Sequence, residues 1–156
     1  MPDPFNLARF IEAQRGVYET ALAELRAGAK RSHWIWFIFP QIKGLGSSST
    51  AQHFALSGLA EARAYVAHPT LSGRLLACTE AVTALPGTPT AHAIFSSPDD
   101  LKFRSSMTLF REAAEDPAPF QAALDRFFGG DPDPRTLDAL LSEMPSPPPS
   151  DAVRRS

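Results

Sequence analysis

Four of the Xaa-Pro pairs in this chain precede apolar residues spaced as on one face of an α-helix. These four are Asp-Pro at 3–4, 116–117 and 133–134, and Ser-Pro at 97–98. Asp and Ser side chains accept hydrogen bonds from the first unpaired N–H groups of a helix, and proline fits the first helical turn. The sequence therefore predicts a helix start at each of the four pairs.

Apolar residues three and four positions apart predict six helices in all. Their expected ranges are 4–27, 59–68, 69–85, 97–116, 117–130 and 133–144. The ending "PSPPPSDAVRRS", residues 145–156, is rich in proline and charge and is predicted to be a disordered tail. We expect one all-α domain over residues 1–144, with about six helices.

Composition excludes several classes of protein. The 15 basic and 17 acidic residues give a net charge of -2, which does not favour nucleic acid as a partner. The single cysteine excludes an internal disulfide and suits a reducing compartment. No signal peptide precedes the first helix, so we expect a cytoplasmic protein. The four histidines show no metal-binding spacing, and we expect neither a metal nor a cofactor.

The stretch "HWIWFIFP", residues 33–40, is the exception to the helical pattern. It is far shorter than the roughly 20 apolar residues that span a bilayer, so we expect no membrane contact. Its apolar residues are continuous, and a short buried extended segment or a single helical turn both fit them; we expect the extended form. Either one of Trp34 and Trp36 lines a pocket or both belong to the core. An indole face beside His33 would suit stacking on a planar ring.

The following loop, "QIKGLGSSST", combines glycines with hydroxyl side chains. Gly44 and Gly46 permit a tight turn, and the N–H groups around Ser48 could bind an anion, with Gln41 at the start of the loop. The loop is not a Walker motif, since its lysine precedes the glycines. A flexible turn that caps the next helix explains the same residues.

A third candidate lies in "SPDDLKFRSSMTLF", residues 97–110. On a helix, Asp99, Lys102 and Ser106 share one face, with Ser105 beside them. A solvated face with an Asp–Lys pair worth a few tenths of a kcal/mol is the simpler interpretation. Small hydroxyl side chains would also let another segment or a ligand approach closely, and a desolvated lysine could act as a nucleophile.

Three stretches together resemble the bacterial family called domain of unknown function 1810, whose members are often labelled calpastatin. They are "HWIWFIFPQIKGLGSSS", "EARAYVAHPTLSGRLLACTEAV" and "IFSSPDDLKFRSSMTLF", and the resemblance covers roughly residues 5–142. It implies a mainly helical fold. A fainter similarity to NADAR and YbiA-like N-glycosidases implies a YbiA-like fold and activity on ribosylated molecules. There a lysine forms an adduct with ribose, a role that would fall here to Lys102 or Lys43.

These observations predict an enzyme or binder for a ribosylated or nucleotide-like small molecule. Asp99 would act as acid or base, and Lys102 would trap the opened sugar. The predicted ligand-binding residues are His33, Trp34, Trp36, Gln41, Gly44, Gly46, Ser48, Arg74, Ser105 and Ser106. A distance above about 15 Å between Trp36 and Lys102 would contradict this site. The alternative is a non-enzymatic helical protein-interaction module with these aromatic residues in its core.

Overall fold

The computed structural model describes residues 3–143, and within that range it contains ten α-helices and no β-strand. The helices are α1 (Ala8–Gln14), α2 (Tyr18–Arg26), α3 (Ile35–Ile38), α4 (Ser49–Phe54), α5 (Leu59–Ala67), α6 (Pro69–Thr83), α7 (Ala91–Phe95), α8 (Asp99–Ala113), α9 (Ala118–Phe128) and α10 (Pro134–Ser142). The all-α class is confirmed. The predicted tail at 145–156 lies outside the described residues.

The helix count exceeds the expected six for local reasons. The helix expected over 4–27 is two helices, since Gly16 adopts φ +74° between α1 and α2 and breaks the repeat. The short helices α4 and α7 are preceded by the N-cap residues Ser48 and Thr90, whose side chains each accept a backbone N–H at 3.0 Å. Helices of five or six residues are too short to show an apolar period.

One of the three Asp-Pro pairs caps a helix as predicted, since Asp133 is the N-cap of α10 and accepts the backbone N–H of Thr136 at 3.2 Å. Asp3 and Asp116 accept the backbone N–H groups of Leu7 and Ala118 at 2.7 and 3.1 Å, but neither is the N-cap of its helix. At the Ser-Pro pair, α8 begins at Asp99 without a side-chain cap.

The aromatic stretch 33–40 forms one helical turn, so the expected extended segment is wrong. The N–H groups of Ile38 and Phe39 donate to the carbonyls of Trp34 and Ile35 at 3.1 and 3.0 Å. These four side chains are buried, whereas the two between them are partly exposed. This i, i+1, i+4, i+5 burial fits a helix with one face in the core, whereas a half-buried strand would alternate.

Helix α8 is the centre of the fold, and its residues from Ser105 to Phe110 are all buried. Phe103 on this helix stacks on Phe95 of α7 at 4.6 Å between ring centroids and meets Phe39 edge-on at 4.9 Å. Helices α5, α7, α9 and α10 all contact α8. Because this part of α8 is surrounded by other helices, small hydroxyl side chains at 105, 106 and 108 leave room for those helices to approach closely.

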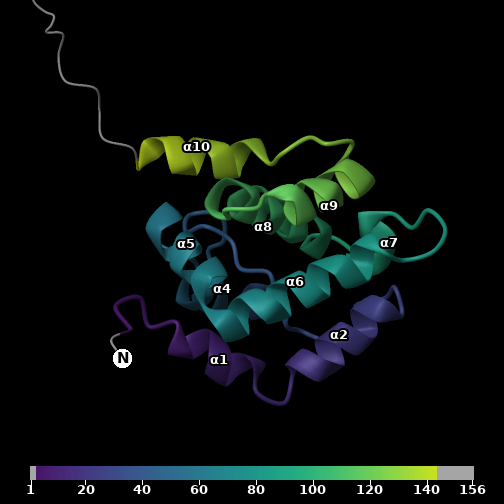
Figure 1. Ribbon diagram of the computed structural model, residues 1–156, viewed down its shortest axis with the longest axis horizontal. Helices are drawn as coiled ribbons and strands as arrows, with labels where there is room; N and C mark the ends of the chain where they lie inside the picture. Colours follow the sequence, from purple (N-terminus) through teal and green to yellow (C-terminus); the bar gives the residue numbers. More distant parts are fainter. Residues whose placement is uncertain (1–2, 144–156) are drawn as a thin grey trace, which may run out of the picture.

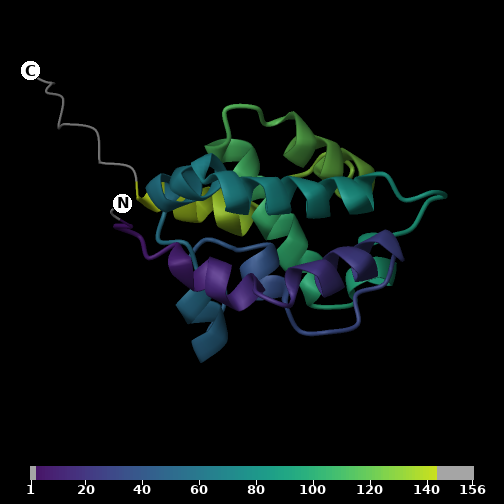
Figure 2. The same ribbon diagram turned by 60° about the horizontal axis from the view of Figure 1, so that its bottom comes forward.

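The N-terminal and C-terminal helices lie on opposite sides of the molecule (Figure 1). Figure 1 shows α1 and α2 along one side and α10 along the opposite side, with α6 between them. Figure 2 shows α8 passing through the middle of the molecule behind α6. None of the helices within residues 3–143 has the length and apolar character to cross a membrane.

Candidate functional site

Two tryptophans and two lysines meet around one carboxylate, a group we call the Trp36–Lys102 cluster. It consists of Lys30, Trp34, Trp36, Asp99 and Lys102. The Lys102 ammonium lies 5.1 Å from the centroid of the Trp36 ring, and the Lys30 ammonium lies 5.0 Å from that of Trp34. Trp36 and Lys102 are therefore close enough for one small ligand to contact both, as the sequence analysis required.

The two lysines share Asp99 unequally. Lys30 Nζ lies 2.7 Å from Asp99 Oδ2, with only 6% of its side chain exposed. Lys102 Nζ lies 3.4 Å from Asp99 Oδ1, and 25% of its side chain is exposed. Two ammonium groups beside one carboxylate leave a net positive charge. Lys102 is the less tightly held of the two and is the cation that an incoming anion would reach first.

Trp34 is the buried base of the cluster and lines none of the three hollows described below, which differs from its expected ligand contact. It is completely buried, and its indole Nε1–H donates to Glu24 at 2.9 Å. Glu24 also accepts the Ser32 hydroxyl at 2.6 Å and the backbone N–H groups of Arg31 and Ser32. Burial raises the pKa of Glu24, but these hydrogen bonds outweigh it and lower the pKa to about 2. The ionised Glu24 thus fixes the orientation of the Trp34 ring.

The two serines of α8 also lie inside the protein, not on an open face. The Ser105 hydroxyl donates to the Asp133 carboxylate at 2.8 Å, and its oxygen also lies 3.1 Å from the Leu101 carbonyl oxygen. Ser106 is completely buried, and its hydroxyl has no hydrogen-bond partner in the described part of the chain. The segment that approaches this face closely is the start of α10, and neither hydroxyl faces solvent where a ligand could reach it.

The glycine-serine loop mainly shapes the chain between α3 and α4. Ser48 caps α4, which fits the simpler interpretation of this loop. A Cβ at Gly46 would lie 2.7 Å from the Ala51 side chain, so the close approach requires glycine. Gln41 and Gly46 border Trp36 in a cavity of about 10 Å³, which is roughly the room for one water molecule. Gly44 faces a separate, open depression.

Arg74 and His33 do not join the cluster. Arg74 donates to the Gln14 side chain at 3.1 Å, and its guanidinium lies 5.1 Å from the centroid of Tyr18. In the described residues no hydrogen bond or ion pair connects Arg74 with the cluster. His33 is exposed and its side chain makes no hydrogen bond within residues 3–143.

Two hollows of the described chain lie away from the cluster. One groove of about 600 Å³ runs between α5, α6 and the connection from α8 to α9. A more open depression of about 680 Å³ lies between the 42–46 loop and α10. Neither is lined by Trp36, Asp99 or Lys102. Sequence reasoning missed the first groove, because the acidic run "EAAED" at 112–116 forms one edge of it only once α5 and α6 lie opposite.

No three His, Cys, Asp or Glu side chains within residues 3–143 are grouped so that they could hold a metal ion. The single cysteine, Cys78, is completely buried on the inner face of α6, and burial raises its pKa to about 12. A thiol with so high a pKa carries almost no thiolate at neutral pH and is a poor nucleophile. The Trp36–Lys102 cluster is therefore the one described site where the sequence predictions converge.

Comparison with known proteins places the chain in a family. The family model described as "protein of unknown function (DUF1810)" matches residues 4–140. The crystal structure of the conserved hypothetical protein Rv1873 from Mycobacterium tuberculosis is similar, with 48% sequence identity and a TM-score of 0.87. The match covers 89% of this chain and 99% of that chain. The chain matches no curated protein.

Neither comparison supports the fainter similarity to NADAR and YbiA-like proteins or the YbiA-like fold that it implied. The family match spans all ten helices except the last two residues of α10. The resemblance that the three sequence stretches suggested is confirmed over the same part of the chain. The chain belongs to the family of proteins of unknown function called DUF1810.

Proposed function

We propose that the protein binds a small, planar, anionic molecule of the nucleotide type at the Trp36–Lys102 cluster. The observation that carries the proposal is the position of Lys102, whose ammonium lies 5.1 Å from the Trp36 centroid and only loosely, at 3.4 Å, against Asp99. A base can stack on the partly exposed indole, while the ammonium pairs with a phosphate. Lys30 adds a second positive charge behind it.

The position of the cluster favours binding without catalysis. The cavity beside Trp36 has about 10 Å³, so a ligand would lie over the ring at the surface. An N-glycosidase-like reaction on a ribosylated ligand, with Asp99 as acid or base and Lys102 trapping the sugar, works best where water is excluded. Asp99 already neutralises Lys30 at 2.7 Å, which ties its carboxylate to a structural role. We therefore restrict the proposal to binding.

Tryptophan fluorescence tests the proposal directly, because the chain has two tryptophans and only Trp36 is partly exposed. Titration with AMP and ADP-ribose should quench the Trp36 contribution and leave the emission of buried Trp34 unchanged. Lys102→Ala should weaken binding on the order of tenfold, the size of one charge-assisted hydrogen bond. Lys43→Ala removes an exposed lysine outside the cluster and should leave the affinity unchanged.

Two results would overturn the proposal. One is the absence of quenching by both nucleotides at millimolar concentration. The other is quenching that Lys102→Ala and Lys43→Ala weaken equally, which would indicate unspecific attraction of an anion by surface charge. Thermal unfolding of each variant shows whether the fold is intact. We expect Lys102→Ala to remain folded, because Asp99 keeps its ion pair with Lys30 in this variant.

A helical protein-interaction module is the second candidate function. The specific observation in its favour is a groove of about 600 Å³ between α5, α6 and the α8–α9 connection. None of the cluster residues lines this groove, so it offers a separate surface for a partner. A cytoplasmic location is part of both proposals, because a single buried cysteine suits a reducing compartment.

A further inference from the structure

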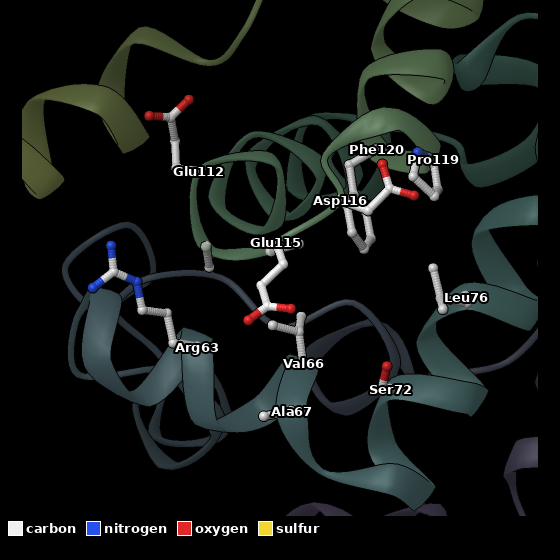
Figure 3. A pocket seen from close by; sticks show the side chains of 12 residues that line it. Arg63, Val66, Ala67, Ser72, Leu76, Glu112, Glu115, Asp116, Pro119 and Phe120 are labelled. Carbon is white, nitrogen blue, oxygen red and sulfur yellow. The ribbon is translucent and has the colours of Figure 1, made fainter.

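The groove beside α5 combines an apolar floor with an acidic edge, and we call it the acidic-rimmed groove. Its lining residues are Arg63, Val66, Ala67, Ser72, Leu76, Glu112, Ala113, Ala114, Glu115, Asp116, Pro119 and Phe120. Its volume, about 600 Å³, lies within the roughly 300–1,000 Å³ range of ligand sites. Figure 3 shows the two walls, with Val66, Ser72 and Leu76 facing the residues of the α8–α9 connection.

The floor of the groove is apolar. Val66 of α5, Leu76 of α6 and Phe120 of α9 belong to or pack against the core, and Phe120 is only 2% exposed. Ala113 and Ala114 add small side chains that keep the space open. A surface of this kind gains free energy when it covers an apolar side chain of about the size of leucine.

The rim is negatively charged, because three carboxylates and one guanidinium line the groove. Glu112 already pairs with Arg111 at 2.9 Å. Glu115 makes neither an ion pair nor a hydrogen bond in the described part of the chain, and Figure 3 shows its side chain extending over the groove towards Val66. Its carboxylate is therefore free to attract a cation that enters the groove.

The main chain at the rim has backbone N–H groups that could form hydrogen bonds with a partner. Ala114 has extended torsions, φ -79° and ψ 147°, where α8 ends. Within residues 3–143 the backbone N–H groups of Glu115 and Asp116 donate no hydrogen bond. The chain then bends at Glu115, and these exposed, unpaired N–H groups can donate to the carbonyls of an extended peptide laid alongside, while the groove takes its side chains.

We propose that the acidic-rimmed groove binds an extended segment of a partner protein in which arginine or lysine stands beside an apolar side chain. The apolar side chain fills the space over Val66, Leu76 and Phe120, the cation pairs with Glu115, and the main chain pairs along Ala114–Asp116. This inference rests on the interaction-module candidate and names the chemistry of its partner. It is independent of nucleotide binding, since no residue lines both sites.

Fluorescence polarisation with labelled, capped peptides tests the inference on the full chain. One peptide places arginine between two leucines, a second replaces arginine by glutamate, and a third keeps arginine but replaces both leucines by serine. We expect binding of the first peptide only. Glu115→Lys should weaken it on the order of tenfold, because it replaces an attraction by a repulsion at the rim. Glu19→Lys, the same charge change on exposed α2, should alter the affinity less than twofold.

Each outcome has a defined meaning. No binding of the arginine–leucine peptide, or equal binding of the arginine–serine peptide, overturns the inference. So does equal weakening by Glu115→Lys and Glu19→Lys, which would reflect net charge alone. Lys102→Ala must leave peptide binding unchanged and Glu115→Lys must leave nucleotide quenching unchanged. Failure of the groove is thereby distinguished from failure of the Trp36–Lys102 cluster.

Discussion

Glu24→Gln should remove a large part of the acid sensitivity of this protein. Glu24 is bound by the Trp34 indole, the Ser32 hydroxyl and two backbone N–H groups, and its pKa falls from 4.5 to about 2. A glutamine amide keeps the oxygen that accepts three of these bonds and can donate to the Ser32 hydroxyl with its nitrogen. The substitution therefore removes the charge and preserves the shape.

The pKa difference sets the magnitude. A shift of this size corresponds to about 3 kcal/mol of folding free energy at pH 7, as an upper value because water reaches part of the carboxylate. The folded pKa is depressed, so this contribution is complete above the unfolded pKa of about 4.5 and is lost as pH falls towards about 2. About 2 kcal/mol of it should disappear between pH 7 and pH 3.

Urea unfolding followed by far-ultraviolet circular dichroism at a series of pH values gives the measurement. The stability difference between the natural chain and Glu24→Gln should shrink steadily from pH 6 to pH 3. Glu19→Gln, on the same helix but exposed, should follow the natural chain at every pH. A difference between Glu24→Gln and the natural chain that stays constant over this range would refute the reasoning.

One further substitution and one chemical probe test the buried residues Ser106 and Cys78. Ser106→Ala should leave stability unchanged or raise it by up to about 1 kcal/mol, because the hydroxyl is buried without a partner; a clear loss in thermal unfolding would show that the hydroxyl is bound. Cys78 should react with a thiol reagent at pH 8 only after unfolding, since it is completely buried and its pKa is raised to about 12. A fast reaction of the folded protein would contradict this burial.

Sequence reasoning worked best where the signal is local. Asp133 caps α10 as predicted, because an N-cap needs only a short acceptor and the next few N–H groups. His68 caps α6 through its Nδ1 for the same reason, at 3.4 Å from the N–H of Leu71. The break at Gly16 escaped prediction, since the apolar spacing of the 4–27 range continues across it.

The candidate site was found only in part. Trp36, Asp99 and Lys102 do meet, but Trp34 and Ser106 lie in the core and Arg74 is held by Gln14 and Tyr18. Residue type indicates what a side chain can bind, but not which neighbours the fold brings to it. For the same reason the acidic run at 112–116 could not be recognised as the edge of a groove before α5 and α6 were placed opposite it.

The sequence by itself determined the all-α class, the starts of α5, α6, α9 and α10 and the family, because these depend on residues that are neighbours in the chain. Only the tertiary structure decided which distant groups became partners. Arg9 pairs with Glu61 at 2.8 Å and Lys30 pairs with Asp99 at 2.7 Å, each across a long stretch of chain. Such pairs follow from how the helices pack around α8, since burial, not spacing in the sequence, determines which charges must meet.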